Sequence, residues 1–294
     1  MRVTNAGSAS LALAAMSKTS ERVAEVQAQI ASQRKITRPS DDPAGAAAAL
    51  SLRSATARDV AFQRSTSDAL GRLGTIDSTL GSATEQLQRA QDLVRQGLNT
   101  GTLDSGAQAA LADQIQNARA NLLALANTTD GSGRPLFGGT AGSGAAFAAD
   151  GSYLGTDGVP SRLVAEGTSV PVGAVGGAVF GSGADSVFAG LDAAAAAVRS
   201  GDVDGARTAL DRIDAGVTAV SRARSQAGAT SARITATSDA AATARVGTAA
   251  ALSALQDVDV AQVSIDLSSA QFAYQVSLQV AAGTHQTSLL DFLR

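Results

Sequence analysis

Residues 73–94 read LGTIDSTLGSATEQLQRAQDLV, and this stretch carries the clearest structural signal in the chain. Its apolar or small residues recur at alternating spacings of three and four: Leu73, Ile76, Leu80, Ala83, Leu87, Ala90 and Val94. Because 3.6 residues make one helical turn, this spacing puts them on one stripe of an α-helix. The stripe predicts a packed helix, and its partner is either the core of a bundle or a seam between subunits.

The prolines set the limits of the long helices, because proline breaks a helix interior. Residues 44–134 and 172–294 contain none. We therefore expect one helix, or two collinear ones, from Asp41 to about Leu98. A turn at Asn99 then leads to a second helix that ends near Asn127. The two helices would form an antiparallel hairpin.

The last third of the chain predicts a return helix and a separate terminal helix. The return helix shows the same alternation at Val203, Ala206, Leu210, Ile213, Val217 and Val220. After a break near Asp257 and Asp259, a second stripe follows at Val260, Val263, Leu267, Ala270 and Tyr274. The N-terminal segment offers Leu13, Met16, Val23 and Ile30. Both terminal segments have few large apolar residues, so we expect them to fold by pairing with each other and with neighbouring subunits.

The middle of the chain differs in composition. Residues 131–190 are rich in glycine, with scattered phenylalanine, tyrosine and valine, and predict a small β-containing insertion. The predicted fold class is mainly α: a long, coiled-coil-like bundle of the N- and C-terminal arms, with a small β-rich domain inserted in the middle. The expected parts are a core helix and joint (1–40), a rod arm (41–134), a β-rich outer domain (135–190), a return arm (191–256) and a C-terminal core helix (257–294).

Charge and residue usage argue against several function classes. The 294 residues include 23 basic and 26 acidic ones, interspersed, so no basic stripe favours nucleic acid. With no cysteine and one histidine, His285, in a polar patch, we expect no catalytic residue, cofactor or metal site. No apolar run is long enough to insert in a membrane, and Met1–Asn5 does not open a cleaved signal peptide. A non-enzymatic structural protein is the expectation.

The sequence Ser40-Asp41-Asp42-Pro43 predicts a helix start, because an acidic cap precedes a proline at the first helical position. The basic segment before it should be extended, since a residue preceding proline avoids the helical region. We interpret Arg38, Asp41 and Asp42 as part of a joint between a terminal helix and the main rod, where a subunit could flex or contact its neighbour. An ordinary capped helix is the alternative.

The stretch QRKITRPSDDPAG at residues 33–45 resembles the N-terminal signature of the bacterial flagellin and hook-associated protein superfamily. Its Arg-Pro-Ser-Asp-Asp-Pro form, together with NTTDGSGRPLFGG at residues 127–139, is similar to the hook-associated protein 3 family of hook-filament junction proteins. The segments AQFAYQVSL at 270–278 and SLLDFL at 288–293 resemble the end of that family. The likeness is weakest over residues 140–200.

The resemblance implies a structural subunit of the bacterial flagellum that adapts the hook to the flagellin filament. It implies a ring of copies, contacts with the first junction protein and with flagellin, a cytoplasmic export chaperone, and an extracellular location reached through the flagellar type III apparatus. The expected assembly residues are Leu13, Met16, Val23, Ile30, Arg38, Asp41, Asp42, Leu267, Tyr274, Leu278, Leu289, Leu290, Phe292 and Leu293.

Two alternatives stay open. One is a flagellin that forms the filament itself, against which the Arg-Pro-Ser-Asp-Asp-Pro motif and the Leu-Leu-Asp-Phe-Leu-Arg end argue. The other is a secreted enzyme on a flagellin-like scaffold, which would need converging acids in the middle region. Only four acids lie there, without a histidine: Asp150, Asp157, Glu166 and Asp185.

Overall fold

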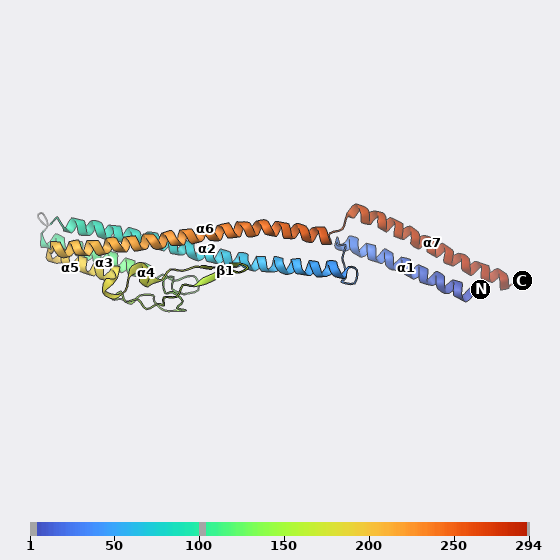
Figure 1. Cartoon of the computed structure of the whole chain (residues 1–294), viewed down its shortest axis with the longest axis horizontal. Coiled ribbons are helices and arrows are strands. Elements are labelled where there is room, and N and C mark those ends of the chain that lie inside the picture. The colour runs from blue at the N-terminus through green and yellow to red at the C-terminus, as the bar shows by residue number, and fades with distance from the viewer. Residues whose placement is uncertain (1–4, 100–103, 293–294) are drawn as a thin grey trace. The chain divides into compact units, whose positions relative to one another are not determined.

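The computed structural model describes the backbone at residues 5–99 and 104–292, and side chains within those ranges except at residues 5, 6, 8, 9 and 283–292. It divides into a terminal unit, residues 1–58 and 243–294, and a central unit, residues 59–242 (Figure 1). The elements in chain order are α1 (Asn5–Ser32), α2 (Pro43–Gly97), α3 (Ser105–Ala126), β1 (Ser161–Ala165), β2 (Thr168–Pro171), α4 (Gly176–Phe180), η2 (Gly183–Asp185), α5 (Val187–Ser200), α6 (Val203–Gln256) and α7 (Val260–Phe292).

The core of the central unit is the predicted stripe of α2. All its residues from Leu73 to Val94 are buried, and they pack in one cluster with Ile213, Val220 and Ile234 of α6. Two polar contacts fix the antiparallel register: Gln91 donates to Asp214, and Nε of Arg224 lies 2.8 Å from Oδ1 of Asp77. Both contacts join α2 to α6 of the same chain. The bundle-core interpretation of residues 73–94 is therefore confirmed.

A second helical pair completes the bundle. Helix α3 begins where Oδ1 of Asp104 accepts a hydrogen bond from the Ala107 N–H at 2.7 Å, and it ends at Asn127 as predicted. It packs on α5, which the sequence spacing did not separate from the return arm, and Figure 1 shows the two side by side. Helix α5 ends at Gly201, whose φ of 71° is a left-handed conformation that favours glycine.

The inserted segment, residues 127–186, holds little sheet. One antiparallel hairpin of β1 and β2 confirms the predicted β-structure, and loops, α4 and η2 make up the rest. Its interior is a cluster of aromatic rings with centroids 5.2–6.0 Å apart: Phe137, Phe147, Tyr153, Phe180 and Phe188. Because each ring buries a large apolar area, contacts among these few rings, and not a sheet, stabilise the segment.

Arg72 of α2 forms an ion pair and hydrogen bonds with this inserted segment. Its guanidinium lies 2.5 Å from Oδ2 of Asp130, and its Nε donates to the carbonyl of Val172 at 2.9 Å. Burial lowers the pKa of Arg72. Burial also acts to raise the pKa of Asp130, but hydrogen bonds from Ser132 and Arg134, with the charge of Arg134, outweigh it and lower that pKa to about 2. The pair is therefore charged at neutral pH.

Candidate assembly interface

The terminal unit is built on the pairing of the two ends of the chain. Helices α1 and α7 lie side by side and run in opposite directions (Figure 1). The hydroxyls of Thr19 and Ser277 lie 3.1 Å apart across the contact, which fixes its register. The residues turned toward the partner helix are buried or half-buried: Ala12, Met16, Thr19, Val23, Val26 and Ile30 on α1, with Val263, Leu267, Ala270, Tyr274, Ser277 and Ala281 on α7. We call this contact the terminal seam.

The terminal seam repeats every three or four residues, the pattern that keeps two helices in continuous contact. It is nonetheless thin, because several of its members are alanine, serine or threonine and only Val26, Val263 and Ala270 are buried. Full burial of a valine or leucine contributes about 1.5–3 kcal/mol, whereas ordering each backbone residue costs about 1–2 kcal/mol. The seam therefore offsets only part of the cost of ordering the 28 residues of α1.

Some of the apolar residues predicted to act in assembly lie in the terminal seam, and others are exposed. Met16, Val23, Ile30, Leu267 and Tyr274 lie in the terminal seam. Leu13 is 58% exposed and Leu278 is 41% exposed, so neither lies in the seam. Val260, expected to open the stripe of α7, is also exposed, and the seam begins at Val263 instead. The side chains of Leu289, Leu290 and Phe292, and the whole of Leu293, fall outside the described residues.

Helix α7 carries a second apolar stripe that the sequence spacing did not single out. Six large apolar side chains are exposed among the described residues of α7. Val260 and Leu278 flank the terminal seam, and we call the other four the outer stripe: Ile265, Phe272, Val276 and Val280. At 100° per residue, Ile265, Phe272 and Val276 lie on the side of α7 opposite the terminal seam, and Val280 lies at the edge of that side. A helix that is apolar on two sides is typically buried on both of them. The sequence signal for this second stripe was that apolar residues occur on all sides of α7.

The segment between α1 and α2 contacts the segment between α6 and α7, and we call this contact the joint. The chain between α1 and α2 forms an antiparallel bridge, Arg34 with Asp257, in the break between α6 and α7. The Lys35 N–H donates to the Gln256 carbonyl at 2.6 Å, and Arg53 of α2 donates to the Gln256 side chain at 2.9 Å. The break near Asp257 is therefore confirmed. The bridge at Arg34 agrees with the extended backbone expected before Pro39, and the chain then turns between Arg38 and Asp41.

The three polar residues expected at the joint have local roles in the structure. Oδ2 of Asp41 accepts hydrogen bonds from the Arg38 N–H at 2.8 Å and from the Thr37 hydroxyl at 2.9 Å, and these lower the pKa of Asp41. Oδ1 of Asp42 accepts from the Gly45 N–H at 2.9 Å, so it caps α2, which begins at Pro43 as predicted. The side chain of Arg38 is exposed.

Replacing Gly45 with alanine is expected to destabilise the terminal unit by about 1–2 kcal/mol, through loss of a helix cap and overpacking. A Cβ at this position would lie 2.7 Å from Cδ1 of Ile36 and would collide with the Asp42 carboxylate. The free energy of unfolding of the full chain measures the effect. Gly247→Ala is the matched control, because no atom lies within 4 Å of its added Cβ. Equal stabilisation by both substitutions would contradict the steric argument.

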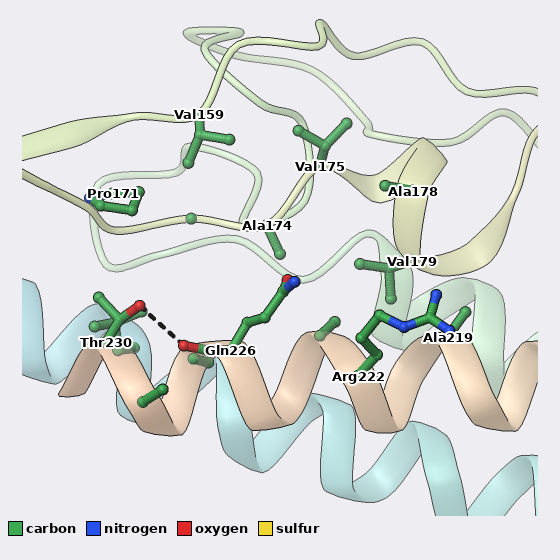
Figure 2. A pocket seen from close by; sticks show the side chains of 15 residues that line it. Val159, Pro171, Ala174, Val175, Ala178, Val179, Ala219, Arg222, Gln226 and Thr230 are labelled. Atoms are coloured by element: carbon green, nitrogen blue, oxygen red, sulfur yellow. Dashed lines mark hydrogen bonds between the residues drawn. The ribbon is translucent and has the colours of Figure 1, made fainter. Parts of the chain in front are cut away.

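A groove of about 600 Å3 lies within the central unit, between the inserted segment and α6. Figure 2 shows Val159, Val175 and Val179 facing the α6 residues Ala219 and Gln226. Among its lining residues the only charged one is Arg222. None of the four acids of the middle region lines it: Asp150, Asp157, Glu166 and Asp185. The groove therefore lacks the acid–base groups that catalysis needs.

Among the side chains that the structure describes, no group of three or more histidine, aspartate or glutamate residues is placed to bind a metal ion. Over residues 5–99 and 104–292, no helix combines the length and the apolar character needed to cross a bilayer.

The fold and the candidate interface define a class: a helical protein whose two chain ends pair into one antiparallel unit. Residues 3–142 match the bacterial flagellin N-terminal helical region, and residues 210–293 match the bacterial flagellin C-terminal helical region. The first range covers α1, α2 and α3, and the second covers most of α6 with α7. Much of the inserted segment and α5 lie between them.

Named relatives narrow the family further. Over 209 residues the chain is 32% identical to flagellar hook-associated protein 3 of Escherichia coli (strain K12), a match that covers 64% of this chain and 66% of that protein. The chain thus spans just under two thirds of that relative's length. The chain belongs to the bacterial flagellin superfamily, and the named relative that it resembles is a hook-associated protein 3.

Two solved structures share the fold. A flagellar hook-associated protein from Vibrio parahaemolyticus superposes with a TM-score of 0.68 at 21% identity, covering 73% of this chain and 99% of that chain. The flagellar junction protein FlgL from Legionella pneumophila superposes with a TM-score of 0.57 at 14% identity, covering 71% and 99%. At such identities the likeness is evidence for the fold alone.

Proposed function

We propose that this protein is a hook-filament junction protein, a structural and non-catalytic subunit that adapts the hook to the flagellin filament of the bacterial flagellum. The observation that carries the proposal is the outer stripe of α7, which leaves four large apolar side chains exposed beside a thin terminal seam. Such a surface suits a subunit whose terminal helices become buried in an assembly. The relatives are hook-associated and junction proteins by name, which supports the same role.

The mechanism is coupled folding and assembly. In one copy the terminal seam offsets only part of the ordering cost of α1 and α7. When neighbouring subunits cover the outer stripe, each buried valine, isoleucine or phenylalanine contributes about 1.5–3 kcal/mol more. Several such contacts per copy, repeated around a ring of copies, make the assembled state the stable one.

The proposed partners follow from the position of such a subunit. They are other copies of this chain in a ring, the first hook-filament junction protein on one side, and flagellin on the other. Before assembly the exposed apolar side of α7 would need protection, which a cytoplasmic export chaperone would provide. The protein would then be extracellular on the flagellum, exported through the flagellar type III apparatus.

A flagellin remains the second candidate, because both family regions are named for flagellin. The Arg38–Pro43 motif and the names of the relatives favour the junction role instead.

Cells that lack this gene are expected to build hooks without filaments and to release flagellin into the medium. Without an adapter, exported flagellin has no surface on which to polymerise. Electron microscopy of the flagella and an assay of secreted flagellin measure both effects, and the gene restored in trans is the control. Normal filaments on the deleted strain would rule out the junction role and favour a redundant flagellin.

A further inference from the structure

Three arginines line a small pocket in the central unit, and one carboxylate, Asp130, pairs with two of them. The pocket measures about 250 Å3 and lies between α2 and the inserted segment. Arg72 of α2, Arg134 of the loop after α3 and Arg162 of β1 line it, and we call it the arginine pocket. Two hydroxyl side chains, Thr140 and Ser161, also line it, whereas no aspartate or glutamate does.

The charges of the arginine pocket are not balanced within the chain. Asp130 forms ion pairs with two guanidiniums, because Arg72 lies 2.5 Å from its Oδ2 and Arg134 lies 3.4 Å from the same atom. Arg134 also donates from Nε to the Ser132 hydroxyl at 3.0 Å. Arg162 is a half-buried residue, and its guanidinium makes no hydrogen bond or ion pair with a described side chain or backbone group. Three positive charges therefore face one negative charge.

The position of Arg162 indicates which kind of ligand the excess positive charge of the arginine pocket would bind. On the β1–β2 hairpin, Arg162 is half-buried between the exposed residues Ser161 and Leu163. It lines the pocket, and it is close enough to Arg72 for its charge to act on the pKa of that group. A positive charge that is partly removed from water and has no counterion is unfavourable, and the planar fork of a guanidinium matches a carboxylate.

We propose that the arginine pocket binds a carboxylate, with Arg162 as its main donor and Arg134 as a second. Asp130 keeps Arg72 in place and lends rigidity to one wall. The carboxylate comes either from a small organic acid or from an aspartate or glutamate side chain of a second copy of this chain. This proposal does not depend on the role in the flagellum.

The test uses the full chain labelled with 15N-arginine and follows the Nε–Hε signals by NMR during a titration with succinate. Saturable shifts are expected for Arg134 and Arg162, assigned from single variants. Arg162→Gln keeps a hydrogen-bonding side chain but removes the charge, so succinate affinity should fall about tenfold. Arg233→Gln, at an exposed position of α6, is the matched control and should leave the affinity unchanged.

Two further arms identify the source of the carboxylate. In buffer without organic acids, shifts of the same signals with rising protein concentration would identify a side chain of a second copy. Shifts with succinate alone would identify a small acid, and either result supports the pocket. Sodium chloride at equal ionic strength separates binding from screening. Equal shifts of all arginine signals, or an Arg162→Gln variant that binds succinate as the original chain does, would overturn the proposal.

Discussion

Replacing Phe272 with aspartate is expected to abolish filament attachment while leaving the isolated protein folded. Phe272 is 68% exposed on the outer stripe of α7, so the monomer loses few contacts. In an assembly that covers this stripe, each copy would lose about 1.5–3 kcal/mol of apolar burial and would also bury an unpaired carboxylate, which costs further. Swimming motility, filament counts by electron microscopy and secreted flagellin measure the outcome.

The matched control is Gln271→Asp, which adds the same charge to an exposed polar position of the same helix. It should retain filaments. Both variants should unfold within about 0.5 kcal/mol of the original protein, as surface substitutions usually do. Wild-type filaments on cells with Phe272→Asp would mean that the outer stripe stays exposed, and the assembly mechanism would have to be withdrawn.

Replacing Asp130 with asparagine is expected to lower the free energy of unfolding by about 2–3 kcal/mol, because Arg72 is left as a largely buried charge without its partner. The two side chains are only 16% and 11% exposed. For a domain of this size the loss corresponds to a fall in melting temperature of roughly 5–10 °C. Asp204→Asn is the control, since Asp204 and Arg207 form an exposed pair.

The effect should depend on pH in a defined direction. The folded pKa of Asp130, about 2, lies below its ordinary value of 3.8, so the ionised carboxylate stabilises the folded state. That contribution is fully present well above pH 4 and is lost as the pH falls toward 2. The difference in unfolding free energy between the original chain and Asp130→Asn should therefore shrink over this range. A difference that stays constant down to pH 2 would show that the carboxylate charge is not the cause.

Local rules predicted the long elements from the sequence with good accuracy. Alternating spacings of three and four from Leu73 to Val94 located the buried side of α2, because helix periodicity needs no knowledge of the partner. Asp42 and Pro43 located its start, because capping acts within one turn. The break was predicted near Asp257 and Asp259, two acidic residues that directly precede the stripe beginning at Val260.

Features that depend on distant residues were missed or only partly predicted. Helix α5 is rich in alanine, which fits a continuous arm as well as a separate helix, and only its packing on α3 distinguishes the two. Leu13 shares helical spacing with Met16 only loosely, so its exposure depends on where α7 lies. The inserted segment has strand-like composition, yet its rings pack directly on one another and leave one short hairpin.

The amino-acid sequence by itself determined the long helices and the superfamily, because periodicity, caps and signature stretches are properties of neighbouring residues. The tertiary structure decided which apolar sides are covered and which charges are paired. The two sides of α7 differ because α1 occupies one of them, and Arg72 differs from Arg162 because Asp130 and the carbonyl of Val172 lie beside Arg72. Both differences are made by contacts between residues far apart in the chain, which no local pattern contains.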